Sequence, residues 1–203
     1  MNSSVFEKHA QLSAQPVVKL FYIIYRRLLE HGVWPTFLWV QDKILRRVLG
    51  FSPPRISRVQ PNLYVGGQQR PHGLARMRAL GISAVVNMRE EADDIARGVA
   101  LDHYLWLPTT DDTPPAQEDF ARGVDFITAQ IAAGRGVYVH CAAGVGRAPS
   151  MAAAYLIRTG MTAEQAWAAI RKSRPFIRPT PPQIEALAAF EAVKHATVNR
   201  LEG

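Results

Sequence analysis

One short stretch of the chain holds the residue types of a nucleophilic phosphate site. It reads His140-Cys-Ala-Ala-Gly-Val-Gly-Arg-Ala-Pro-Ser150, with five residues between Cys141 and Arg147. Its two glycines permit tight dihedrals, so successive backbone N–H groups can point at one tetrahedral anion. Arg147 adds a planar fork that holds two phosphate oxygens. We therefore predict a phosphate-binding loop made of Ala142, Ala143, Gly144, Val145, Gly146 and Arg147.

Cys141 is the only cysteine of the chain and comes directly before this predicted loop. Backbone N–H groups, a helix N-terminus and an arginine favour the thiolate at neutral pH, and the thiolate is the nucleophilic form. Against a bound phosphate it would attack phosphorus and form a phospho-cysteine. The alternative, a buried cysteine acting as a small apolar side chain, gives no reason for the glycines and the arginine. A single cysteine excludes an internal disulfide and hence a disulfide-stabilised secreted scaffold.

The predicted reaction also needs an acid to protonate the leaving oxygen. A proline-bounded loop upstream of Cys141 carries Asp111 and Asp112. A carboxylic acid there would protonate the leaving group and, once ionised, activate water against the phospho-cysteine. The residues themselves leave both aspartates open. We expect His140, which precedes the nucleophile on a buried strand, to orient the loop through hydrogen bonds rather than act as a base.

Alternating strand and helix patterns predict the elements that position these residues. The expected strands are 62–65, 82–88, 101–107 and 136–140, and the expected helices are 74–80, 120–131 and 149–159. Capping boxes at 162–165 and 180–183 open two further helices. This order predicts an α/β domain with a mainly parallel sheet flanked by helices. Such sheets bind ligands beyond the carboxyl ends of their strands, where the loop after 136–140 lies.

The charge of the chain is unevenly distributed. The formal net charge is +7, of which residues 1–60 carry +6. Because the rest is nearly neutral, the basic character does not indicate a nucleic-acid-binding protein. The sequence GFSPPR at 50–55 breaks the helical pattern, and we place a boundary there between an N-terminal basic segment, residues 1–52, and a catalytic domain, residues 53–203.

The N-terminal segment contains two predicted amphipathic helices, 17–29 and 37–49. The second places seven residues on one face, with the charged side chains opposite: Phe37, Leu38, Gln41, Ile44, Leu45, Val48 and Leu49 against Asp42, Lys43, Arg46 and Arg47. These helices either pack on the main domain or lie on an anionic membrane surface. The apolar stretches within these two helices are far shorter than the roughly 20 residues that a membrane-spanning helix needs. The sequence shows no secretory leader. We expect a cytoplasmic protein for which residues 17–49 offer peripheral membrane contact.

The Cys141 and Arg147 loop with its upstream aspartates resembles the dual-specificity class of the cysteine-dependent protein-tyrosine-phosphatase superfamily. The resemblance covers about residues 56–195 and includes Val-Val-Asn-Met-Arg at 85–89 and Ile-Arg-Pro-Thr-Pro-Pro-Gln at 177–183. It implies that Cys141 is the nucleophile, Arg147 the phosphate clamp and Asp111 the general acid, with no metal and no organic cofactor. It also implies a hydrolase acting on phosphotyrosine, phosphoserine and phosphothreonine in proteins.

Two finer resemblances imply other substrates. Residues 107–113 and the following helix are similar to the mitochondrial phosphatidylglycerophosphate phosphatase and its bacterial relatives, which implies a phospholipid substrate. Gly-Arg-Ala-Pro at 146–149 is similar to the regenerating-liver and plant starch phosphatases, and against the former Asp112 would be the acid. A module that binds phosphorylated ligands without turnover is a further alternative, although such a module usually lacks one of the three catalytic groups.

Position 148 departs from the family pattern, and two charged runs, 90–94 and 171–174, each allow two interpretations. Most members follow the loop arginine with Ser or Thr, whose hydroxyl helps the thiolate leave, whereas this chain has Ala148, with Ser150 nearby. We therefore expect a slow second step. The acidic run 90–94 is more typical of a solvated helix start than of a metal site. Residues 171–174 and Arg178 fit either the rim of an anionic pocket or a solvated helix end.

Overall fold

The computed structural model describes residues 22, 24, 25, 28, 29 and 32–201, with the backbone alone for 194–201. Its centre is a five-stranded sheet in the order β1 (Arg58–Gln60), β2 (Leu63–Gly67), β5 (Gly136–Cys141), β3 (Ile82–Arg89) and β4 (His103–Thr109). β1 is antiparallel to β2, and the other neighbours are parallel. This confirms the predicted α/β fold. Because β5 lies in the middle, its last residue, Cys141, emerges at the centre of the carboxyl edge.

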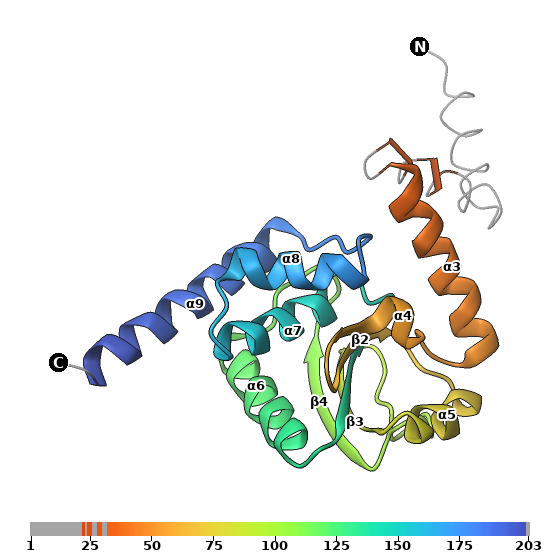
Figure 1. The fold of residues 1–203 in the computed structure, drawn as a ribbon, viewed down its shortest axis with the longest axis horizontal. Coiled ribbons are helices and arrows are strands. Elements are labelled where there is room, and N and C mark those ends of the chain that lie inside the picture. The colour runs from red at the N-terminus through yellow and green to blue at the C-terminus, as the bar shows by residue number, and fades with distance from the viewer. Residues whose placement is uncertain (1–21, 23, 26–27, 30–31, 202–203) are drawn as a thin grey trace, which may run out of the picture.

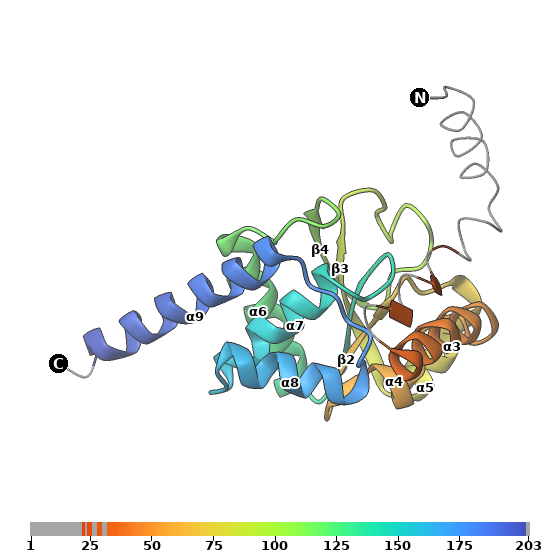
Figure 2. The same cartoon turned by 90° about the horizontal axis from the view of Figure 1, so that it is seen from above.

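Helices cover both faces of the sheet. Figures 1 and 2 show α6 (Gln117–Ala132), α7 (Arg147–Arg158), α8 (Ala163–Ser173) and α9 (Pro181–Leu201) on one side. The 3₁₀ turn η1 (Pro71–Gly73), α5 (Leu74–Ala79) and α3 (Val33–Leu49) lie together on the other side, and α4 (Pro54–Ser57) links α3 to β1. No helix in the described ranges is long and apolar enough to cross a membrane.

The alternation of β5 divides the core between these two layers. Val137 and Val139 are fully buried against the α6–α9 side, in one cluster with Cys141. Tyr138, one position out of phase, packs with Phe51 on the α5 side. This period of two places Cys141 on the face covered by α7 and the preceding His140 on the opposite face.

Several element boundaries differ from the predicted ones. β2 continues through Gly66 and Gly67, beyond the expected end at Val65, because these glycines pair with His140 and Cys141. A Cβ on Gly66 would overlap the Tyr138 ring, so glycine is required for this close approach. Helix α7 begins at Arg147, two residues before the expected start, and β4 spans 103–109 instead of 101–107.

The capping boxes differ in outcome. The box at Thr162 is complete, with both reciprocal hydrogen bonds to Gln165. At Thr180 only half is present: Gln183 accepts from the Thr180 backbone N–H, while the Thr180 hydroxyl donates to the carbonyl of Asp112. Gln183 also donates to the carbonyl of Thr113. The start of α9 thus holds the aspartate loop in place.

The helix expected at 37–49 is observed as α3, but its buried side differs from the predicted apolar face. Leu38, Trp39 and Asp42 are buried, whereas Phe37, Ile44 and Val48 are exposed. Trp39 and Leu38 pack on Phe176, which follows α8. Asp42, which the pattern placed on the charged side opposite the apolar face, is therefore on the buried side of the helix. The helix expected at 17–29 lies mostly outside the described residues.

Candidate active site

The loop from β5 to α7 has its peptide carbonyls turned away from Cys141. The carbonyl of Ala142 accepts from Arg46, those of Ala143 and Gly144 accept from Arg174, and that of Val145 accepts from the backbone of Arg178. In a trans peptide the next N–H points opposite to the carbonyl, so the N–H groups of residues 143–146 face the inside of the loop. One of these is seen directly, since the Gly144 N–H donates to the Cys141 sulfur at 3.2 Å.

Gly144 is required for this loop on two grounds. Its φ of +68° lies in the left-handed region, and a Cβ on it would sit 2.4 Å from the backbone of Gly66. Both the bend and the close approach to β2 exclude a larger side chain. Cys141 itself is buried, with 3% of its surface exposed, at the base of the loop.

The guanidinium of Arg147 is buried and is held by two carboxylates. Glu91 accepts from Nη1 and Nη2 at 2.9 and 3.1 Å, and Asp111 pairs with Nη2 at 2.9 Å. The carbonyl of Thr109 accepts a further bond from Nη1 at 2.8 Å. The buried Nε has no hydrogen-bond partner among the described residues. A buried N–H group without an acceptor, such as this Nε, is available to donate a hydrogen bond to the oxygen of a bound anion.

These charges stabilise one another. Burial acts to lower the pKa of Arg147, but the hydrogen bond to Glu91 and the charges of Cys141 and Asp111 outweigh it and raise that pKa. The hydrogen bond from Arg147 lowers the pKa of Glu91 to about 2 against the opposing effect of burial. The arginine therefore stays cationic, and Glu91 stays anionic, across the neutral range.

The structure brings one of the two candidate acids to the loop. Asp111 reaches Arg147 while most of its side chain, 73%, remains open to solvent. Asp112, at a φ of +60°, contacts the neighbouring elements through its backbone carbonyl, which accepts from Thr180. Asp111 is thus the aspartate that is positioned next to the phosphate loop.

His140 is held in a fully buried network. Its Nε2 lies 2.7 Å from Asp94, and its Nδ1 lies 3.4 Å from the carbonyl of Cys141. Asp94 also accepts from the amides of Gln68 and Gln69. Burial acts to raise the pKa of Asp94, but these hydrogen bonds, that of His140 first, lower it overall. The contacts agree with an orienting function of His140.

The interpretation of residues 90–94 as a solvated run was wrong for Asp94, and it did not include the ion pair of the exposed Glu91. Glu91 pairs with the loop arginine, and Asp94 is completely buried against His140. Sequence spacing gave no signal for either contact, because both depend on a loop folding back over the carboxyl edge of the sheet.

Arg174 also differs from both predicted roles, since it neither rims a pocket nor lies in water. It is fully buried, and its guanidinium holds the outer side of the loop. The buried carboxylate of Asp42 in α3 forms ion pairs with two arginines. It lies 3.5 Å from the guanidinium of Arg174 and 3.0 Å from that of Arg46. The hydroxyl of Ser52 donates to the other oxygen of Asp42 at 2.6 Å. Only the i, i+4 spacing of Asp42 and Arg46 was visible in the sequence.

The hydroxyl of Ser150 does not replace the one that Ala148 lacks. Ser150 donates to the carbonyl of Gly146 at 3.0 Å, within its own helix. Ala148 is fully buried beside the loop. The described residues therefore offer Cys141 the Gly144 N–H and no hydroxyl at this position.

Comparison with known proteins agrees with this geometry. The phosphatidylglycerophosphate phosphatase PTPMT1 of Arabidopsis thaliana is 26% identical over 143 residues, which are 68% of this chain and 42% of that protein. Dual specificity protein phosphatase 5 of Homo sapiens is 30% identical over 123 residues, 60% of this chain and 32% of that protein. The chain thus spans less than half the length of these relatives.

Solved structures give the same result. The crystal structure of PTPMT1 superposes with a TM-score of 0.64 at 28% identity and covers 71% of this chain and 98% of its own. PTPMT1 in complex with PI(5)P gives 0.63 at 28% identity, covering 69% and 96%. The family model for the dual specificity phosphatase catalytic domain matches residues 63–193. This chain belongs to the family of dual-specificity phosphatase catalytic domains.

Proposed function

We propose that the chain hydrolyses phosphomonoesters through a phospho-cysteine at Cys141. The observation that carries this proposal is the buried, unpartnered Nε of Arg147 in the same loop as a cysteine sulfur that already accepts a backbone N–H. A phosphate in the loop would give the Nε an acceptor and would meet the inward N–H groups of 143–146.

In the first step the Cys141 thiolate attacks phosphorus, and the bond to the ester oxygen breaks. The N–H groups of the loop and Arg147 hold the three equatorial oxygens, where charge is concentrated in the transition state. Asp111, displaced from Arg147 by the phosphate, lies beside the leaving oxygen and donates the proton that it needs.

In the second step water attacks the phospho-cysteine. Asp111, now ionised, takes a proton from that water, the S–P bond breaks, and Cys141 leaves as a thiolate. The N–H of Gly144 stabilises the departing sulfur. With Ala148 next to the loop arginine, this departure lacks a hydroxyl donor, so hydrolysis of the phospho-enzyme is the slow step.

Hydrolysis of para-nitrophenyl phosphate by the full chain tests the proposal. Cys141→Ser should abolish turnover and retain binding of inorganic phosphate or vanadate, and the wild-type enzyme should show saturable, metal-independent activity. A wild-type chain that binds phosphate but releases no para-nitrophenol would be a binding module, and the catalytic proposal would be rejected.

The family supports phosphorylated proteins as substrates, and α3 supports phospholipids as a second candidate. Val33, Trp34, Phe37, Ile44 and Val48 form an exposed apolar stripe along α3. Lys43 and Arg47 lie beside this stripe, which is the arrangement that favours the surface of an anionic bilayer. We propose that α3 brings the chain into peripheral contact with a membrane that holds its substrate.

A further inference from the structure

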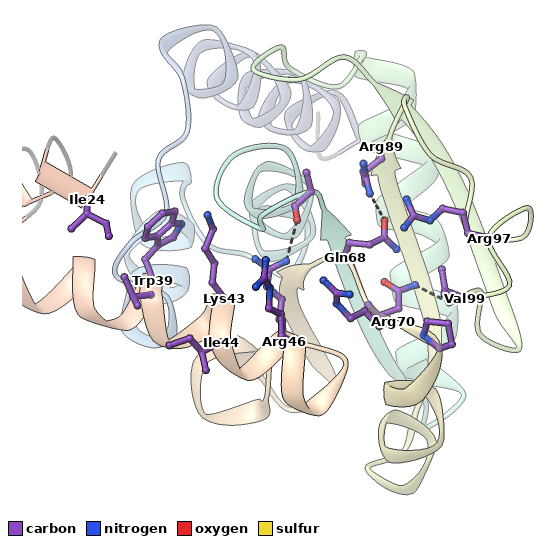
Figure 3. Close-up of a pocket in the computed structure, with 15 residues that line it drawn as sticks. Ile24, Trp39, Lys43, Ile44, Arg46, Gln68, Arg70, Arg89, Arg97 and Val99 are labelled. Atoms are coloured by element: carbon purple, nitrogen blue, oxygen red, sulfur yellow. Dashed lines mark hydrogen bonds between the residues drawn. The ribbon is translucent and has the colours of Figure 1, made fainter. Parts of the chain in front are cut away.

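A cavity of about 820 Å³ opens next to the phosphate loop, between α3, the segment after β2 and the loop before β4 (Figure 3). None of its described lining residues is an Asp or Glu. Six of its lining residues are cationic: Lys43, Arg46, Arg47, Arg70, Arg89 and Arg97. In Figure 3, Arg70 and Arg97 extend toward the same space as Lys43 and Arg46, from three different parts of the chain.

Part of this positive charge is not compensated by neighbouring groups. Arg46 is paired with Asp42, and Arg89 with Glu91. The guanidinium groups of Arg47, Arg70 and Arg97 make no hydrogen bond or ion pair with any described residue. Like charges gathered around one cavity repel one another, and an anion in their midst would convert this repulsion into attraction.

The cavity is adjacent to the catalytic loop through two contacts. Ala142, which follows Cys141, lies in the cavity wall, and its carbonyl accepts from Arg46. Glu91 accepts from Arg89 of the cavity and from Arg147 of the loop through the same oxygen. The side chain of Glu91 therefore lies between the basic cavity and the phosphate loop, and a ligand with two anionic groups can bind at both.

The wall formed by α3 is apolar at the other end. Trp39, Val40 and Ile44 of α3 line it, together with Ile24, which precedes that helix, and Ile44 is also part of the exposed stripe of α3. A ligand bound here thus meets arginines at one side and hydrocarbon at the other. A phosphorylated lipid head group joined to acyl chains has this distribution of charge and hydrocarbon.

The geometry points to a second anion subsite: the cavity holds a second phosphate group on the head group of a phospholipid while the scissile phosphate lies in the loop. This inference rests on the proposed phosphatase activity and assigns its substrate a second phosphate. Lys43 and Arg47 come from α3, which lies outside the matched catalytic-domain residues 63–193. The N-terminal helix therefore contributes to substrate selection.

The test compares kinetics on matched substrates. Dihexanoyl phosphatidic acid has one phosphate, and dihexanoyl phosphatidylglycerophosphate has a second one with the same acyl chains. Glycerol 3-phosphate and glycerol 1,3-bisphosphate repeat the comparison without acyl chains. Arg70→Gln and Arg97→Gln remove cavity charge, and Arg122→Gln on α6 removes the same charge from a remote exposed site.

Each cavity variant should raise KM for the two-phosphate lipid by roughly tenfold, because it removes one charge-assisted contact. KM for phosphatidic acid and for para-nitrophenyl phosphate should change less than about twofold, as should every value for Arg122→Gln. The same rise in KM for glycerol 1,3-bisphosphate would show that the second phosphate is sufficient for binding at the subsite. A rise in KM for the two-phosphate lipid alone would show that the apolar wall also contributes to binding. Both outcomes support the subsite.

An equal rise for one-phosphate and two-phosphate substrates, or no change for either, would overturn the inference. So would a selective loss that occurs only with a doubly phosphorylated peptide. Failure of the proposed function looks different, because activity on para-nitrophenyl phosphate would then be absent or would survive Cys141→Ser. Thermal unfolding of each variant, expected to match that of the wild type, confirms that these exposed substitutions leave the fold intact.

Discussion

Asp42 lies 3.5 Å from Arg174, a residue 132 positions away, and both side chains are almost completely buried. The carboxylate also pairs with Arg46, so one anion from α3 serves both arginines that hold the outer carbonyls of the phosphate loop. A helix outside the catalytic-domain match is thereby part of the support of the loop.

Replacement of Asp42 by Asn should destabilise the chain by about 3 kcal/mol, because it leaves two arginines near a buried site without their counter-charge. Urea unfolding measures the change. Asp125→Asn, which removes an exposed partner of Arg158, is the matched control and should cost less than about 1 kcal/mol. Equal losses for the two variants would show that Asp42 has no special structural role.

Asp111→Asn should lower kcat/KM, which reports the first step, by about 100-fold or more on phenyl phosphate, a substrate with a poor leaving group, since the leaving oxygen loses its acid. The loss should be smaller for para-nitrophenyl phosphate, whose leaving group needs less protonation. Asp112→Asn is the control, because asparagine tolerates the left-handed backbone at this position. A larger loss for Asp112→Asn would assign the acid to Asp112.

Ala148→Ser should speed hydrolysis of the phospho-enzyme by supplying a hydroxyl near the cysteine sulfur. The wild type should release a burst of para-nitrophenol before its steady state, and the variant should show a smaller burst with a higher kcat. Rapid-mixing kinetics measures both. Unchanged kinetics in the variant would contradict a slow second step caused by Ala148.

The pair of Glu91 with Arg147 should have a defined pH dependence. Because the folded pKa of Glu91 is lowered to about 2, from about 4.3 in the unfolded chain, its stabilising contribution is complete above pH ~5 and is lost as pH falls toward ~2. The difference in urea midpoint between the wild type and Glu91→Gln should therefore shrink between pH ~4 and ~2. A difference that grows on acidification would contradict the assigned pairing.

Membrane contact through α3 is tested with point variants, because removal of α3 would also remove Asp42. Phe37→Asp combined with Val48→Asp should weaken binding to vesicles that contain anionic phospholipid by about tenfold or more. Leu80→Asp introduces the same type of change at an exposed apolar residue outside the stripe. Binding should also weaken with added salt. Equal binding by all forms would show that the stripe does not face a membrane.

The local pattern of the sequence was sufficient to predict the chemistry of the loop. Glycines, a cysteine and an arginine at fixed offsets between a strand and a helix predicted the phosphate cradle, because the strand, turn and helix propensities involved act over a few residues. The same reasoning predicted the mainly parallel α/β fold, which the structure confirms. It left two aspartates open as the acid, because neighbouring residues in one loop differ in direction, which sequence spacing does not show.

Only the tertiary structure decided which charged residues surround that loop. The sequence indicated a solvated run for Glu91 and Asp94, since most such residues are exposed. It placed Asp42 on the charged face of its helix and left Arg174 between a pocket rim and a solvated helix end. The fold buries Asp94, Asp42 and Arg174 and pairs the exposed Glu91 with Arg147. These pairings appear only when α3, the loop after β3 and the segment after α8 meet at one edge of the sheet. The sequence by itself thus predicted Cys141 as the nucleophile and residues 142–147 as its cradle, because these roles depend on local spacing. The fold decided the ion pairs that hold this loop and the basic cavity beside it, because both join distant parts of the chain.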